Sequence, residues 1–381
     1  MGRDSSIRCA AVFLTVALLG GCTASVDPLA DPSRDPFSQP VVPTSPSSGT
    51  SGAGSTGSSS DAPQPRHGRG VVTAVVPEGS ALSETAARDF RSTTGFTLQQ
   101  VEVPIDDLAQ GAPEGTRTDV VLGLDAGDAL EAAADGGLAT TAPQDTTTPE
   151  GTALAGVPAA TAYARDDVCV LADTEWFSAN RESLPTSLSD LASGKWAELL
   201  LVPDPAGSVE GRAFTRAAQA DLGKGVDAWW SALTSGGART GSAEGLQKLW
   251  TASAGAVEGG RPLLVARQSL SAATLTDTGT ESTSVAVPGT CLERMLYSAP
   301  TQDPVNADGA EALVAWLRGS SAQRELAAAG VAQPLAAEDA EGTVIGWFAQ
   351  PTDGAVSLPE DEVAAARERA QSWSKGLEGS E

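Results

Sequence analysis

The sequence predicts an α/β fold built on doubly wound sheets. Short β-branched runs, of which residues 71–76 are the first, alternate with amphipathic segments through short connections, and this alternation is typical of such sheets. The chain has 381 residues, of which 41% are hydrophobic, enough for a sizeable core and two lobes. No internal repeat of solenoid period is visible.

The opening elements follow from local signals. The run at 71–76 is β-branched and predicts a buried parallel strand. Either Ser80 or Ser83 caps the helix that follows, and Gly95 ends it. Residues 97–103 then predict a second strand.

The same order of strand, turn and helix returns in the next segment. Residues 120–124 predict a strand and 129–134 a helix. Ligands of doubly wound sheets bind at the carboxyl ends of strands. Ser80 and Asp125 come directly after predicted strands, which makes them candidate ligand residues.

A Gly-rich turn, "PDPAGSVEG", lies between a predicted strand at 199–202 and a helix. The free N–H groups of such a helix start suit an anionic or polar group, so Ser208 is a second kind of candidate. Ordinary helix capping explains the same residues equally well. The turn is neither a Walker loop nor a nucleophile elbow, because Gly211 is not followed by Lys and Ser208 lacks the G-x-S-x-G frame.

Histidine is almost absent. The single histidine, His67, lies in a polar linker outside the predicted fold. The fold therefore lacks the histidine of a Ser-His-Asp or Cys-His pair and of a zinc site. We predict a protein that is not an enzyme, without catalytic residue, metal or cofactor.

The formal net charge of −25 restricts the partners. Nucleic acid and anionic headgroups are both polyanions and would be repelled, so neither is an expected partner. The charge is compatible with a cationic ligand. Acidic surfaces also serve solubility alone, and the composition does not separate the two explanations.

Residues 1–21 have the pattern of an export signal. Arg3 and Arg8 precede an apolar run at 10–19, which is shorter than the ~20 residues that span a bilayer. "LGGC" resembles the bacterial lipobox. The resemblance implies that Cys22 is diacylated with palmitate-type chains, becomes the new N-terminus and anchors the chain to the outer face of the cell membrane. Secretion with an incidental cysteine is the alternative.

Residues 22–69 are rich in Pro, Ser, Gly and Asp and lack apolar periodicity. We expect a disordered tether, whose roughly 45 residues span an r.m.s. distance of about 35–40 Å. Cys9 falls in the removed signal, and Cys22 carries the lipid. Cys169 and Cys291 are left in the folded part.

Several segments occur in a familiar order: "DVVLGLD", "KWAELLLVPDPAGSVEGRAF", "RPLLVARQS" and the closing "LPEDEVAAARERAQSWSKGL". Over nearly all of 71–377 the chain resembles the solute-binding lipoproteins of ABC importers, of the thiamine-binding type found in actinobacteria. The resemblance implies a two-lobe type II periplasmic-binding-protein-like fold. Lobe one is then 71–164 plus 289–381 and lobe two is 165–288, joined by a hinge of crossover strands.

The same subgroup has cysteines at corresponding positions, which implies a disulfide between Cys169 and Cys291. On the projected fold the two residues lie on the outgoing and returning crossover strands. Adjacent strands place Cα atoms about 4.5–5.5 Å apart, within disulfide range. The bridge would then join the strands of the hinge.

The resemblance also implies the ligand site. Asp125, Ser208 and Ser269 match its pattern, and Glu78 keeps an acidic position. Ser80, Ser242 and Arg267 stand where the family has other residues, aromatic rings among them. The candidate ligand-binding residues are Glu78, Ser80, Asp125, Ser208, Ser242, Arg267 and Ser269.

These departures bear on the ligand. Thiamine-type sites stack aromatic rings on a delocalised cation, and this chain has 4% aromatic residues. Trp250 either replaces the lost rings or belongs to the core. Arg267 either favours a carboxylate or phosphate over thiamine or forms a surface ion pair.

The resemblance implies a monomer that captures a small-molecule solute and delivers it to an ABC permease with its ATPase. Thiamine or thiamine phosphate is the expected solute. One alternative is an importer component for a different, anionic solute. Another is a diverged scaffold that acts in the cell envelope as an interaction or sensor lipoprotein.

Overall fold

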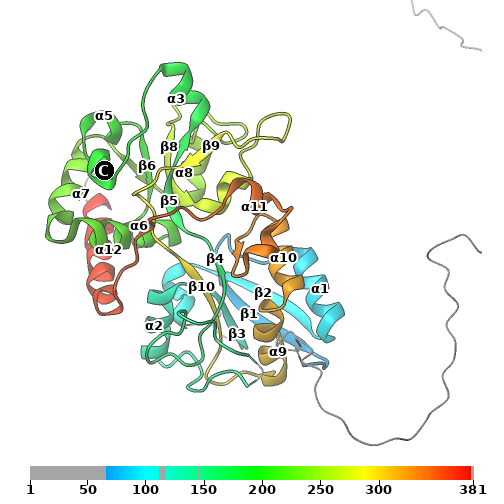
Figure 1. The fold of residues 1–381 in the computed structure, drawn as a ribbon. Helices are drawn as coiled ribbons and strands as arrows, with labels where there is room; N and C mark the ends of the chain where they lie inside the picture. The colour runs from blue at the N-terminus through cyan, green and yellow to red at the C-terminus, as the bar shows by residue number, and fades with distance from the viewer. Residues whose placement is uncertain (1–65, 111–116, 145, 379–381) are drawn as a thin grey trace, which may run out of the picture. The chain divides into compact units, whose positions relative to one another are not determined.

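The computed structural model describes residues 66–110, 117–144 and 146–378 (Figure 1). These residues form the predicted α/β fold, with two sheets. Within these ranges, none of the helices combines the length and apolarity needed to cross a membrane. The expected export signal, Cys22 and the tether up to residue 65 lie outside the described residues.

The first sheet has six strands and is mixed. β1 is parallel to β2 and β3, whereas β10 is antiparallel to both of its neighbours, β3 and β4. In spatial order the strands are β11 (Gln333–Pro334), β4 (Thr161–Arg165), β10 (Met295–Pro300), β3 (Val120–Leu124), β1 (Val71–Pro77) and β2 (Thr97–Val103). We call it the six-stranded sheet.

Helices cover both faces of this sheet, which is why β3 is buried along its whole length. One face packs against α1 (Glu84–Thr94), α9 (Ala307–Leu317) and α10 (Ser320–Ala328). The other packs against η2 (Ile105–Gln110) and α2 (Ala126–Ala134).

Local signals place α1 as expected. Ser83, one of the two candidate caps, accepts a hydrogen bond from the backbone N–H of Ala86. Gly95 ends the helix at φ 82°, a left-handed conformation that glycine adopts without strain. Ser80 is left free of a capping role.

The second sheet has five strands. β6 is parallel to β7 and β8, and β5 is antiparallel to β8 and β9. In spatial order the strands are β7 (Arg239–Gly241), β6 (Leu200–Pro203), β8 (Leu263–Arg267), β5 (Val168–Asp173) and β9 (Ser284–Ala286). We call it the five-stranded sheet.

This sheet also has two apolar faces. Alternate residues of β5 point to opposite sides, so Val170 joins one core cluster and Leu171 the other. The larger cluster is formed with α3 (Thr174–Asn180), α4 (Leu188–Leu191), α5 (Gly194–Ala197), α6 (Val209–Leu222) and α7 (Val226–Ser235). The smaller one is formed with α8 (Ala243–Leu249).

Trp250 belongs to the smaller cluster. Its side chain is 0% exposed, and its indole N–H donates to the carbonyl of Pro262 at 3.2 Å. Of the two interpretations of Trp250, the structure supports a core residue.

The chain passes between the two sheets at 166–167, at 287–294 and again after α11 (Val344–Phe348). These crossing segments lie side by side: Leu292 pairs with Val168 in antiparallel and with Val356 in parallel orientation. The backbone N–H of Val356 donates to the carbonyl of Cys291 at 2.9 Å. Any movement of one sheet relative to the other would bend these segments together.

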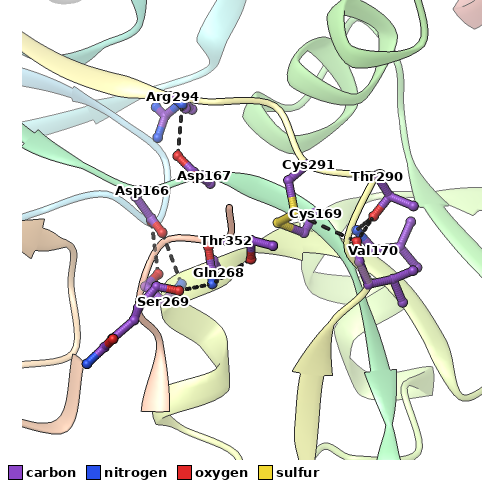
Figure 2. Close-up of a disulfide and its surroundings, with 12 residues drawn as sticks. Asp166, Asp167, Cys169, Val170, Gln268, Ser269, Thr290, Cys291, Arg294 and Thr352 are labelled. Carbon is purple, nitrogen blue, oxygen red and sulfur yellow. Dashed lines mark hydrogen bonds between the residues drawn. A yellow bond between two sulfur atoms is a disulfide. The ribbon is translucent and has the colours of Figure 1, made fainter. Parts of the chain in front are cut away.

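A disulfide joins Cys169 in β5 to Cys291 in the returning crossing segment (Figure 2). The two Cα atoms are 4.1 Å apart, and both side chains are buried in the smaller cluster of the five-stranded sheet. The expected pairing is confirmed.

The closing helix α12 (Val363–Glu378) lies beside α6 (Figure 1). Trp373 of α12 stacks on Trp230 of α7 with ring centroids 4.4 Å apart, inside the larger core cluster of the five-stranded sheet. The expected lobe one, 71–164 plus 289–381, included this helix with the six-stranded sheet. The structure instead packs α12 against the five-stranded sheet. The last crossing segment returns the chain to that sheet, and the apolar face of α12 is buried in its larger core cluster.

Candidate functional site

A pocket of about 280 Å³ lies between the two sheets. It is bounded by the loop at 79–81, which follows β1, and by the end of β8 with the residues after it. This volume is near the lower end of the ~300–1,000 Å³ of small-molecule sites, so the pocket suits a small solute. Its polar and aromatic lining residues are Ser80, Tyr163, Asp166, Glu210, Gln247, Arg267, Ser269 and Arg294.

Arg267 connects the two sides of the pocket. Its Nη1 donates to Ser80 Oγ at 3.3 Å and its Nη2 to the carbonyl of Gly79 at 3.1 Å. Its Nε forms an ion pair with Glu210 of α6 at 3.0 Å. Arg267 therefore links the five-stranded sheet to the loop after β1, and its charge is matched within the protein.

Ser269 and Asp166 form a second polar pair in the pocket (Figure 2). The Ser269 backbone N–H donates to Asp166 Oδ1 at 3.0 Å and its hydroxyl to Oδ2 at 2.9 Å. Burial raises the pKa of Asp166 to about 6, although Arg267, the Ser269 N–H and Arg294 act in the opposite direction. Asp166 was not among the sequence candidates.

Replacing Asp166 by asparagine is expected to change how stability depends on pH. The pKa of Asp166 is 3.8 in the unfolded chain and about 6 in the folded protein. The folded protein therefore holds this proton more tightly, and the free energy of unfolding falls as the pH rises from 3.8 to about 6. Asp166→Asn removes the ionisation; its Oδ1 can accept from the Ser269 N–H, and its amide N–H can donate to the Ser269 hydroxyl. The free energy of unfolding of the variant, relative to that of wild type, should increase between these pH values by on the order of 3 kcal/mol and then stay constant. Urea unfolding at steps of pH measures this, and parallel curves for the two proteins would contradict it.

Arg294 stands just before β10, in the returning crossing segment, and was missed by the sequence analysis. It is 3% exposed, and its Nη2 donates to the carbonyl of Gly123 at 3.0 Å. Its buried Nε–H has no acceptor in the described part of the chain. The one sequence signal was an arginine directly ahead of an apolar run.

Tyr163 is the only aromatic side chain among the described residues that line this pocket. It is buried, and burial raises the pKa of its hydroxyl to about 12. A stacking site with a ring on each side of a flat cation is therefore not formed by the described lining.

Asp125 lies outside the pocket lining. It caps α2, accepting from the backbone N–H of Asp128 at 2.9 Å, and forms an ion pair with Arg216 of α6. Arg216 approaches α2 closely because residue 127 is glycine: a Cβ there would lie 2.6 Å from Arg216 Nη2. The carboxylate of Asp125 thus meets a cation from the layer of the five-stranded sheet.

The remaining sequence candidates also lie outside the lining. Ser208 caps α6 by accepting from the Gly211 N–H, and Ser242 caps α8 by accepting from the Gly245 N–H. Glu78 is exposed directly after β1. The structure thus brings Ser80, Arg267 and Ser269 together and places Glu78, Asp125, Ser208 and Ser242 elsewhere.

The described residues form no cluster suited to a metal ion. Across residues 66–110, 117–144 and 146–378, no three or more His, Cys, Asp or Glu side chains are grouped so that they could hold a metal ion. The charged groups of the pocket are instead Asp166, Glu210, Arg267 and Arg294. Such a set binds polar and charged groups of a solute by hydrogen bonds.

Residues 73–332 match the family described as bacterial extracellular solute-binding protein. Among curated proteins no sequence relative matches. Solved structures share the fold at low identity. A periplasmic thiamin binding protein has a TM-score of 0.64 at 18% identity, over 80% of this chain and 95% of that one. Iron-bound HitA from Pseudomonas aeruginosa has a TM-score of 0.60 at 17% identity, over 81% and 99%.

A third similar structure is the periplasmic binding protein AfuA from Actinobacillus pleuropneumoniae with fructose-6-phosphate bound. Its TM-score is 0.60 at 16% identity, over 80% of this chain and 99% of that one. These three proteins are described with thiamin, iron and fructose-6-phosphate respectively. At this identity the likeness shows the fold, not the ligand.

Proposed function

Because this chain belongs to the bacterial extracellular solute-binding proteins, we propose that it captures a small polar solute in the pocket between its sheets and delivers it to the permease of an ABC importer. The observation that carries this proposal is the composition of the pocket wall, to which both sheets contribute. Ser80 comes from one side, and Arg267 and Ser269 come from the other.

Capture works by closure, without chemistry on the solute. A solute that contacts both sides is bound best when the sheets are close together, so binding shifts the population toward the closed form. The crossing segments are the elements that bend. We take the two lobes as the layers of the six-stranded and five-stranded sheets, with α12 in the second.

For the solute, thiamine and thiamine phosphate are the first compounds to test. The resemblance of the sequence segments favours them, and a thiamin binding protein is among the similar folds. Arg267 and Arg294 in the lining favour the phosphorylated form over the free cation, and a single buried ring gives the cation little to stack on. Sugar phosphates and dicarboxylates are the next classes.

The proposal also covers how the protein is held. We propose that Cys22 carries a lipid anchor at the outer face of the cell membrane, and that 22–69 tether a monomeric binding body, to which Arg66 and Gly68 at the end of this segment are already bonded. The anchor keeps the captured solute close to the permease with its ATPase.

Thermal unfolding in the presence of a solute panel tests capture. The panel contains thiamine, thiamine phosphate, sugar phosphates, dicarboxylates and small cations. A specific solute at about a hundredfold excess over Kd should stabilise the folded protein by about 2.7 kcal/mol. Failure of each of these classes at millimolar concentration would contradict the proposal.

A blocking variant shows whether a responding solute occupies the pocket. Ala243 is a half-buried residue of the lining and belongs to no core cluster, so Ala243→Trp puts an indole into the pocket without disturbing a core. We expect this variant to lose the stabilisation. Ala364→Trp, at an exposed position of α12 away from the lining, is the matched control and should respond as wild type does.

A further inference from the structure

We propose that Arg294 is the anion-binding residue of this pocket, and that the captured solute presents a carboxylate or phosphate group to its guanidinium. The inference rests on the proposed function and specifies the solute class. The residue that selects an anionic solute would then lie in a crossing segment, whereas the candidates predicted from the sequence, such as Ser80 and Asp125, follow strands.

The first argument is that Arg294 is buried without an ion pair. Arg294 lines the pocket and is 3% exposed. Over the described ranges, no Asp or Glu oxygen lies within ion-pair distance, 4.0 Å, of its guanidinium, and its Nε–H has no acceptor. A buried cation in this situation is costly, and an oxyanion in the pocket would supply both the charge and the missing acceptor.

Other arginines that lie between the two sheets are paired. Arg267 has Glu210, Arg216 has Asp125 and Arg165 has Asp167. Of the two arginines that line the pocket, Arg267 has an ion pair and Arg294 has none among the described residues. An anion-binding site needs a cation that is not already paired with a carboxylate of the protein, and Arg294 meets this condition within the described chain.

Figure 2 shows two carboxylates beside Arg294, Asp166 and Asp167, and both have other partners. Asp166 accepts both hydrogen bonds of Ser269. Asp167 accepts from the backbone N–H of Arg294 at 3.1 Å and forms its ion pair with Arg165. Asp166 attracts Arg294 at longer range, but neither carboxylate forms an ion pair with its guanidinium, which leaves that position to a ligand.

The test uses inorganic phosphate and malonate as probes and Arg294→Met as the variant. Thermal unfolding and calorimetric titration are followed at constant ionic strength, with chloride as the balancing anion. We expect phosphate or malonate to stabilise wild type, and Arg294→Met to bind that probe roughly 10- to 100-fold more weakly. In the chloride buffer without phosphate or malonate, the variant should unfold at the same or a higher temperature than wild type, because a buried charge without an ion pair has been removed.

Arg318→Met is the matched control. Arg318 also has a buried Nε–H without an acceptor, but it lies at the end of α9 and does not line the pocket. Its response to the probes should equal that of wild type. Arg294→Lys keeps the charge but not the planar fork, so it should retain a weakened response.

Two results would overturn the inference. One is that neither probe binds wild type at millimolar concentration. The other is that Arg294→Met, or Arg294→Lys if the first variant does not fold, binds the probe as tightly as wild type does. Either result leaves capture itself open to the solute panel, where an uncharged or cationic compound blocked by Ala243→Trp would still support the proposed function.

Discussion

Arg216→Met is expected to lower the free energy of unfolding by about 3–5 kcal/mol at neutral pH. Arg216 of α6 is 7% exposed and forms ion pairs with Asp125 and Asp128 of α2, which are buried as well. Removing the guanidinium takes away the ion-pair partner of Asp125 and leaves Asp128 only the longer contact to Arg212 at 3.6 Å. Urea unfolding of the variant and of wild type measures the loss.

The loss should depend on pH with a definite sign. Burial raises the pKa of Asp125, but Arg216 and Arg294 outweigh it and hold that pKa below its ordinary value. Burial and repulsion by Asp125 hold the pKa of Asp128 above its ordinary value. The contribution of Asp125 is present above its ordinary pKa and is lost as the pH falls. The difference between variant and wild type should therefore shrink in acid.

Arg367→Met provides the control for this prediction. Arg367 of α12 pairs with Glu131 of α2 at 2.6 Å, but its side chain is 43% exposed. An exposed pair contributes about 0–1 kcal/mol, so this variant should lose little. An equal loss in both variants would mean that burial of the Arg216 cluster is not the cause.

Loss of the disulfide is expected to lower the free energy of unfolding by about 2–5 kcal/mol. The bridge joins positions separated by 122 residues, and the closed loop contains the whole five-stranded sheet. Opening it gives the unfolded chain more conformational freedom. Urea unfolding with and without reductant measures the effect.

The double variant Cys169→Ala/Cys291→Ala is the control for the reductant itself. Its unfolding curve should match that of reduced wild type and should not move when reductant is added. If mass spectrometry after alkylation finds Cys169 and Cys291 as free thiols in oxidised wild type, the bridge is contradicted.

Much of the fold was predictable because its signals are local. The strand expected at 97–103 is β2, between Gly95 and Pro104, and that expected at 120–124 is β3, an apolar run between two aspartates. β4 and β10 were not anticipated, although both are central to the six-stranded sheet. β4 is "TAYAR", whose alanines have little strand preference, and it is a strand because its neighbours bury it.

Only some of the residues predicted for the site line the pocket, because local sequence does not decide between two roles. A serine or aspartate after a strand can contact a ligand or cap a helix, and the sequence does not distinguish the two. Ser269 lines the pocket, whereas Ser208 and Ser242 cap helices. Arg294 was missed because its role depends on which carboxylates reach it, and these pairings join residues far apart in sequence.

The packing of α12 places Trp373 in the same half of the molecule as most of the other tryptophans, and this distribution decides which half intrinsic fluorescence reports. Trp316 lies in a core of the six-stranded sheet, and Trp347 is 65% exposed on α11. The other tryptophans pack in the cores of the five-stranded sheet: Trp176, Trp196, Trp229, Trp230, Trp250 and Trp373. Intrinsic fluorescence thus follows chiefly one half of the molecule, and circular dichroism in the far ultraviolet follows both. If the halves melt separately, the two spectroscopic signals will diverge.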